Sequence, residues 1–265
     1  MIKKFKLKEI NKIYKDITLD FLSCLIFFTI IPIKIKPKKL ADSIYTIPLV
    51  SLFIGALVAL PVILLSLFKQ IDLLNSILII ISSSIISGCL HEDGLADFSD
   101  AFGGNTQKRR LEIMNDSNIG TYGTLAIVFS VLIRFILIFF LFSSQSISDV
   151  LLIIISVSVL SRISMLYILS TLPAAKKTGL GKGAKQLNES KIFLSYIATI
   201  IITLFILVIF INLKVFIASI FALIAACLIV SFIAWKKIRG QTGDVCGAVQ
   251  QVSEILIYLF ICLVI

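Results

Sequence analysis

The sequence predicts an all-α, polytopic membrane protein, a bundle of about seven transmembrane helices with a re-entrant or interfacial segment near the N-terminus. Hydrophobic residues make up 58% of the chain and charged residues 15%, whereas soluble domains are about 45–50% apolar and about 25% charged. The mean hydropathy is +1.07. Apolar runs near the length of about 20 residues that crosses the hydrocarbon lie at 44–68, 71–90, 121–142, 149–171, 192–212, 214–235 and 245–265.

The N-terminal region divides into a basic leader, residues 1–20, and a shorter apolar run at 21–33. A run of this length is more typical of a re-entrant or interfacial segment than of a span. We therefore expect a cytoplasmic leader followed by a single membrane-embedded catalytic domain over 21–265, with a cytoplasmic motif loop at 91–120.

The distribution of basic residues supports this topology. The region up to Lys39 and the loops 91–120, 173–191 and 236–244 hold 21 of the 25 Lys and Arg residues. Positive charge marks the cytoplasmic side, so we expect a multi-pass protein of the cell inner membrane with these loops in the cytoplasm. The net charge of +10 does not indicate nucleic-acid binding, because the lysines flank apolar runs and suit the surface of a lipid bilayer.

The loop 91–120 holds an acidic pattern that suits a metal ion. Asp93, Asp97 and Asp100 are spaced i, i+4 and i+7, so on a helix they share one face. Mg²⁺ prefers such hard oxygen ligands and shares them with substrate phosphates. Asp116 would join them if a tight turn at Gly103 and Gly104 separates two short helices. The alternative is a solvated acidic face.

Two kinds of side chain near this pattern could act on an anionic substrate. Arg109 and Arg110 could bind phosphates, or they could only anchor the loop at the membrane surface. His91, the single histidine, is a candidate catalytic acid, base or phosphate contact, or it could cap the preceding span.

Two further polar clusters are candidates for substrate binding. The segment 239–254 carries carboxylates and amides at membrane depth, which favours a functional site, although a structural set of interhelical hydrogen bonds is the alternative. Arg162 could bind an anion or extend to the interface, and a glycine-rich basic loop at 179–183 could cradle phosphate. Arg134 is deep in its span and has no obvious partner. The candidate substrate contacts in these clusters are Asp244, Gln250, Gln251, Glu254, Arg162 and Lys182.

Three segments closely resemble the signature of the cobalamin synthase family, the adenosylcobinamide-GDP ribazoletransferases. They are HEDGLADFSDAFGG at 91–104, LEIMNDSNIGTYG at 111–123 and GQTGDVCGAVQQVSE at 240–254. The resemblance runs from about Phe21 to the C-terminus.

The resemblance implies a reaction. The adenosylcobinamide phosphate of adenosylcobinamide-GDP would pass to α-ribazole or its 5′-phosphate, releasing GMP, with Mg²⁺ required. By the same resemblance, Asp93, Asp97, Asp100 and Asp116 would hold Mg²⁺, and Asp100 is our candidate for the base that takes the acceptor's proton. A homo-oligomer or other cobalamin-assembly enzymes are possible protein partners.

Two rival functions are open at this point. CDP-alcohol phosphotransferases are also membrane enzymes with spaced aspartates, but their motif D-G-x-x-A-R differs from DGLAD at 93–97, where Asp97 comes one place early and no arginine follows. A cation-coupled transporter could use Asp244 and Glu254. It predicts acidic residues in the middle of several spans, whereas most of them here are in one loop.

Overall fold

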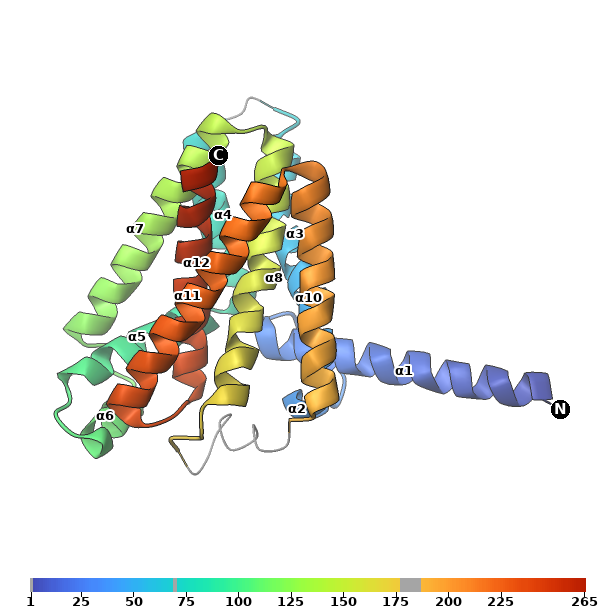
Figure 1. Ribbon diagram of the computed structural model, residues 1–265, viewed down its shortest axis with the longest axis horizontal. Coiled ribbons are helices and arrows are strands. Elements are labelled where there is room, and N and C mark those ends of the chain that lie inside the picture. The colour runs from blue at the N-terminus through green and yellow to red at the C-terminus, as the bar shows by residue number, and fades with distance from the viewer. Residues whose placement is uncertain (1, 69–70, 177–186) are drawn as a thin grey trace.

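The computed structural model describes residues 2–68, 71–176 and 187–265 and shows a bundle of helices (Figure 1). The predicted all-α class is confirmed. The elements in order are α1 (Ile2–Phe28), α2 (Leu40–Ser43), the 3-10 helix η1 (Ile44–Thr46), α3 (Ile47–Leu65), α4 (Asp72–Ser87), α5 (Leu90–Asp100), the 3-10 helix η2 (Ala101–Gly103), α6 (Gln107–Ile113), α7 (Thr121–Ser144), α8 (Ile147–Thr171), α10 (Glu189–Phe210), α11 (Leu213–Ile238) and α12 (Gly243–Val264).

Six helical stretches in the described part of the chain are long and apolar enough to cross a membrane, and a broken pair brings the number to seven. The six are the continuous stretch Leu40–Leu65 and helices α7, α8, α10, α11 and α12. Counting α4 and α5 together as one crossing gives the predicted number of about seven spans.

The predicted span at 71–90 is not a single helix. Helix α4 ends at Ser87, and α5 leaves it at an angle of 86°. Gly88 and Cys89 both take left-handed backbone conformations, with φ of 60° and 57°. Glycine enters that region without a steric cost, and the chain turns there. The sixteen residues of α4 span only about 24 Å at 1.5 Å per residue. Helix α5 therefore begins before the lower end of the bundle in Figure 1, and it runs across the direction of the bundle there.

Helix α8 is the centre of the bundle. In the most apolar stretch of α8, 78% of the residues are buried, whereas 22% are buried in the corresponding stretch of α10. It packs against α3, α10, α11 and α12. Apolar side chains such as Phe205 and Phe221 remain exposed on the outer helices, as expected for surfaces that face lipid tails.

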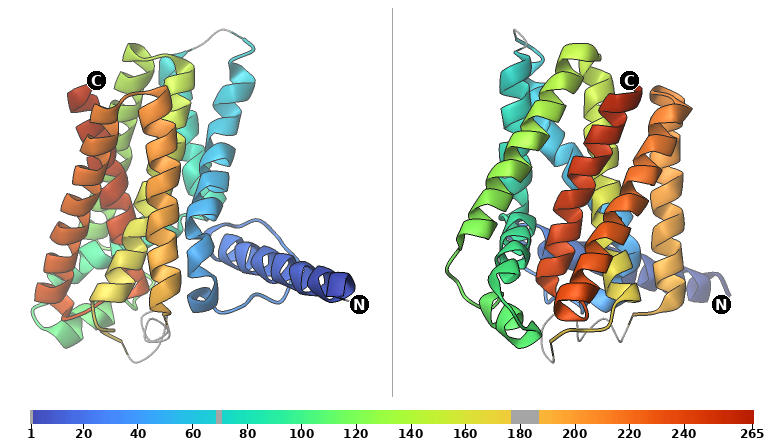
Figure 2. Two further views of the ribbon diagram at one scale, coloured as in Figure 1. Left: turned by 45° about the vertical axis from the view of Figure 1, so that its right-hand side comes forward. Right: turned by 60° about the vertical axis from the view of Figure 1, so that its left-hand side comes forward.

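Helix α1 runs as one helix from the leader into the apolar segment, so no break marks the predicted boundary at residue 20. It lies across the direction of the bundle and projects from it (Figure 2), and it is not among the candidate spans. This agrees with the prediction that 21–33 does not cross. Asp20 fixes the helix, because its carboxylate pairs with Lys38 at 2.8 Å and accepts a hydrogen bond from Tyr45 at 2.6 Å.

The basic loops gather at one end of the bundle, the lower end in Figure 1, and the connections α3–α4, α7–α8 and α10–α11 lie at the other. This separation is the one predicted from charge. We call the lower end the basic end. Two of its loops are joined by backbone hydrogen bonds from Gln241 to the oxygen of Pro173 at 2.8 Å and from Ala175 to the oxygen of Gln241 at 3.0 Å.

Candidate active site

The candidate site is built where α5 crosses α12. A methyl group added at Gly94 on α5 would lie 3.0 Å from the Cα of Gly247 on α12, and one at Gly247 would lie 3.1 Å from the carbonyl oxygen of His91. The two helices can approach this closely only because both positions lack a side chain. Helix α5 thus packs directly against the glycine-containing face of α12.

Three of the four predicted metal ligands line one open cavity at the basic end. Asp93 and Asp97 come from α5, and Asp116 comes from the loop after α6. The cavity has a volume of about 340 Å³ and also includes Asn115. The predicted arrangement of two short helices around a glycine turn is present, with η2 and Gly104 between α5 and α6. We call this space the acidic cavity.

The carboxylates of the acidic cavity fit a cation that keeps much of its water. Across the described residues, no three His, Cys, Asp or Glu side chains converge tightly enough to enclose an ion by themselves. Mg²⁺ seldom uses such a cage, because it retains several waters and binds through one or two carboxylates plus substrate phosphates. A bound cation would relieve the repulsion between the carboxylates that line this cavity.

Asp100 has a different environment from the other three aspartates. Its two carboxylate oxygens accept hydrogen bonds from the backbone N–H groups of Gly120, at 2.7 Å, and Gly123, at 2.8 Å. A side chain at either glycine would collide with this carboxylate. Asp100 therefore clasps the start of α7 to the end of α5, and it is not among the residues that line the acidic cavity. A role as metal ligand or base stays a prediction without support from these contacts.

Lys176, which is not among the predicted substrate contacts, brings a positive charge to the site. Its ammonium group donates to Asn115 at 2.8 Å and pairs with Asp244 at 3.4 Å. The backbone hydrogen bonds at Pro173 and Ala175 hold this lysine in place. The candidate Lys182 lies outside the described residues. The available signal for Lys176 was a lysine a few residues after the end of a predicted span, in a basic loop.

Asp244 and His91 meet Asp93 at a second cavity. This cavity of about 170 Å³ is enclosed mainly by apolar residues of α1, η1, α3, α5, α8 and α12. Asp93 lines both spaces, so the two cavities lie on either side of this residue. Asp244, a predicted substrate contact, thus shares a cavity with Asp93, a predicted metal ligand.

Comparison with known proteins identifies the family of the chain. The family described as cobalamin-5-phosphate synthase matches residues 20–262. The chain belongs to the cobalamin-5-phosphate synthase family. It is similar to an adenosylcobinamide-GDP ribazoletransferase of Mesorhizobium japonicum, with 32% identity over 96% of both chains. A protein of the same name from Clostridium botulinum is 31% identical over 94% of this chain and all of its own length, and one from Azorhizobium caulinodans is 34% identical over 83% of each. No solved structure matches. The chain is an enzyme of the same type as these relatives.

In this cobalamin-5-phosphate synthase family member, the predicted arginine contacts of α6 do not line the acidic cavity. Arg110 donates to the carbonyl oxygen of Lys237 at 3.0 Å, and Gln107 donates to that of Ile238 at 2.8 Å. Both bonds cap the C-terminal end of α11, whose last carbonyls lack partners within the helix. Arg109 is exposed and pairs with Glu112 at 3.3 Å. These contacts give Arg110 a structural role at the end of α11, and phosphate binding by Arg109 and Arg110 stays a prediction.

The amides and carboxylate of α12 lie in a closed polar network inside the bundle. Glu254 pairs with Arg134 at 3.0 Å and accepts from Gln250 at 2.7 Å. Gln251 accepts from Ser130 at 2.9 Å. Arg134 also lies 3.5 Å from Glu92. Glu254 and Glu92 are therefore the partners of Arg134 that the sequence did not reveal.

Arg162 belongs to the same interior region, where it donates to the hydroxyl of Ser158 at 2.7 Å. The cavity lined by Arg162, Arg134 and Glu254 has a volume of only about 20 Å³. That is room for a single water and not for a substrate. The contacts of Gln250, Gln251 and Glu254 suit the structural alternative, and their predicted contact with substrate stays a prediction. Asp244, at the start of α12, instead pairs with Lys176 beside the acidic cavity.

Proposed function

We propose that this enzyme transfers the adenosylcobinamide phosphate group from adenosylcobinamide-GDP to a hydroxyl of α-ribazole or its 5′-phosphate, with Mg²⁺ as cofactor and GMP as the second product. The acceptor oxygen forms a bond to the phosphorus nearer the corrinoid. The bond from that phosphorus to the bridging oxygen breaks, and the electron pair leaves with GMP. The hydroxyl proton passes to a base.

The observation that carries the proposal is the acidic cavity in a chain of this family. Asp93, Asp97 and Asp116 face one space at the basic end, and Lys176 lies beside it. Carboxylates without a cation would repel a diphosphate. The combination therefore supports a metal ion that binds the carboxylates on one side and phosphate oxygens on the other.

We propose a separate role for each residue of the site. Asp93, Asp97 and Asp116 would hold Mg²⁺, which when bound offsets negative charge on the diphosphate. Lys176 would attract the phosphates and orient them toward the cavity. Asp100 keeps the loop with Asp116 in position through its bonds to the start of α7.

The basic end would face the cytoplasm, where nucleotide substrates are available. Its excess of Lys and Arg supports this orientation through the positive-inside rule. Ser190 at the basic end and Ser148 at the opposite end are both exposed. In a variant without its five cysteines, Ser190→Cys should react with an impermeant maleimide only in inverted vesicles, and Ser148→Cys only in intact cells. The reverse pattern would refute the orientation.

A cation-coupled transporter is less well supported. The two carboxylates that it would use are engaged, Glu254 with Arg134 inside the bundle and Asp244 with Lys176 at the basic end. The family match also leaves no observation that favours a CDP-alcohol phosphotransferase.

The proposed reaction can be tested with the full chain purified into lipid. GMP should appear only when adenosylcobinamide-GDP, α-ribazole and Mg²⁺ are all present, with an equal amount of a new corrinoid that contains ribazole by mass spectrometry. Parallel reactions with α-ribazole 5′-phosphate identify the preferred acceptor. If GMP is released with neither acceptor, the proposed function is refuted.

A further inference from the structure

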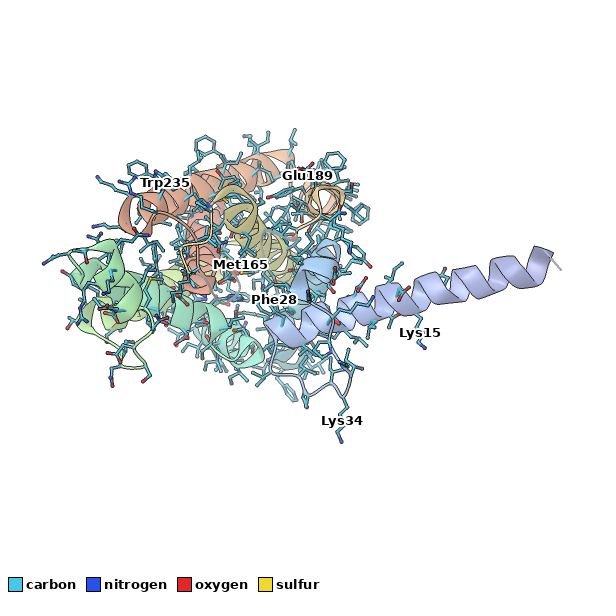
Figure 3. The ribbon with its side chains drawn as sticks, turned by 90° about the horizontal axis from the view of Figure 1, so that it is seen from below. Lys15, Phe28, Lys34, Met165, Glu189 and Trp235 are labelled. Atoms are coloured by element: carbon cyan, nitrogen blue, oxygen red, sulfur yellow. The ribbon has the colours of Figure 1, made fainter. Side chains whose placement is uncertain are left out.

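The cavity that opens toward Asp93 has features of a ligand site that the acidic cavity does not explain. We call it the apolar cavity. Phe28 at the end of α1 and Met165 on α8 are both in its wall, and Figure 3 shows them near the centre of the bundle when it is viewed from the basic end. Leu166 and Leu169 continue the wall along α8, and Ile47 adds to it from the start of α3.

The size of the apolar cavity limits what it can hold. An apolar cavity of about 150 Å³ binds benzene, and this one measures about 170 Å³. A small aromatic ring system fits that space, whereas a corrin macrocycle is far too large. Of the two proposed substrates, only the acceptor nucleoside has a part of this size that is also largely apolar, its benzimidazole base.

His91 gives the apolar cavity an unused polar atom. The side chain lines the cavity and is only 2% exposed, and its Nε2 has no hydrogen-bond partner among the residues that the structure describes. Buried polar atoms are nearly always paired in native proteins. The centre of the Phe28 ring lies 6.2 Å from that of the His91 ring, so an aromatic side chain of the cavity wall borders the imidazole. A planar base with a ring nitrogen can meet both groups.

The position of the apolar cavity places its occupant beside the chemistry. Asp93 and Asp244 stand at its polar side, and Asp93 also lines the acidic cavity. A nucleoside whose base is buried here would extend its sugar toward the carboxylates, where the phosphoryl group is received.

We propose that the apolar cavity between α1, α5, α8 and α12 binds the aromatic base of the acceptor nucleoside, with His91 as a hydrogen-bonding partner. This inference rests on the proposed function, since it names the place of one of its two substrates.

A lipid acyl chain is the other occupant to consider. It has no atom that pairs with the nitrogen of His91. A different cavity, of about 260 Å³ between α8, α10 and α11, is lined by residues such as Ile163, Leu223 and Leu228. It lacks carboxylates and offers a matched control, because α8 contributes to both cavities.

The test fills each cavity with a larger side chain on the same helix. Leu169→Phe reduces the apolar cavity, and Ile163→Phe reduces the control cavity. We expect Leu169→Phe to raise the KM for α-ribazole at least tenfold and to weaken binding of radiolabelled α-ribazole to the protein in nanodiscs, with the KM for adenosylcobinamide-GDP within twofold. Ile163→Phe should leave all three values within twofold. Ile47→Phe, from α3, repeats the test if Leu169→Phe does not fold.

The outcomes separate this inference from the proposed function. If the wild-type protein releases GMP and the filled variants keep the wild-type KM and affinity for α-ribazole, the cavity assignment is wrong and the reaction stands. An equal rise in the KM for both substrates would also overturn the assignment. Loss of a co-purifying lipid with an unchanged KM for α-ribazole would show that the cavity holds an acyl chain instead.

Discussion

Arg134 on α7 and Glu254 on α12 form an ion pair of 3.0 Å inside the bundle, where both side chains are almost fully buried. Each residue comes from a segment that the hydropathy pattern assigns to the membrane. Glu92 on α5 lies 3.5 Å from the same arginine, so the pair also ties the motif helix to the spans around it.

Removing one member of this pair should destabilise the protein. A buried charge without its partner costs about 3–5 kcal/mol. Arg134→Leu is therefore expected to lower the unfolding temperature of the purified protein markedly. The double variant with Glu254→Leu should lose less than the two single changes together. Strictly additive losses in thermal unfolding would show that the two side chains do not interact.

The carboxylates of the acidic cavity should be essential for turnover and dispensable for folding. Asp93→Asn, Asp97→Asn and Asp116→Asn are each expected to lower kcat by more than about 100-fold, because interactions of several kcal/mol with the transition state are lost. Glu112→Gln is the matched control, an exposed carboxylate of α6 outside the cavity. Steady-state GMP release is the measurement. Near-wild-type rates in the asparagine variants would contradict the site assignment.

Asp100 should behave as a clasp and not as a metal ligand. Asp100→Ala removes the acceptor for two backbone N–H groups, and loss of such a cap costs about 0.5–2 kcal/mol. We expect a lower unfolding temperature and an unchanged Mg²⁺ concentration for half-maximal activity. Gly123→Ala should produce a similar loss of stability, because its new methyl group would collide with the Asp100 carboxylate and the carbonyl of Ala96. A large shift in the Mg²⁺ requirement of Asp100→Ala would instead restore Asp100 to the metal site.

Lys176 should contribute to donor binding. Lys176→Gln removes the positive charge beside Asp244 and Asn115, and we expect the KM for adenosylcobinamide-GDP to rise about tenfold, the effect of about 1.4 kcal/mol of lost interaction. Lys108→Gln, an exposed lysine of α6 at the same end, serves as the control and should stay within twofold. Equal effects of the two substitutions would point to general surface charge.

Much of the bundle could be predicted from hydropathy and charge because the bilayer imposes length and sidedness on each span. The break between α4 and α5 could not. Its apolar run continues to Leu90, and only the left-handed conformations of Gly88 and Cys89 reveal the turn. Glycine is tolerated within membrane helices, so its presence alone did not mark an end.

The candidate site was predictable only in part. The spacing of Asp93 and Asp97 placed them on one face, and the glycines allowed Asp116 to join them. The same helical spacing could not show that Asp100 accepts hydrogen bonds from two backbone N–H groups at the start of α7, 20 and 23 residues later. Nor could it show that Gln250, Gln251 and Glu254 are closed off by side chains of α7 and α8, since pairing between distant helices leaves no local pattern.

The Mg²⁺ dependence of GMP release, compared between the wild-type protein and Asp97→Asn, tests the central claim most directly. The proposed site predicts that wild-type release in lipid is absent after chelation, saturates as Mg²⁺ is added, and is lost in Asp97→Asn or displaced to much higher Mg²⁺. Release by the wild-type protein that is equal with and without Mg²⁺, or the same Mg²⁺ curve for both proteins, would contradict it.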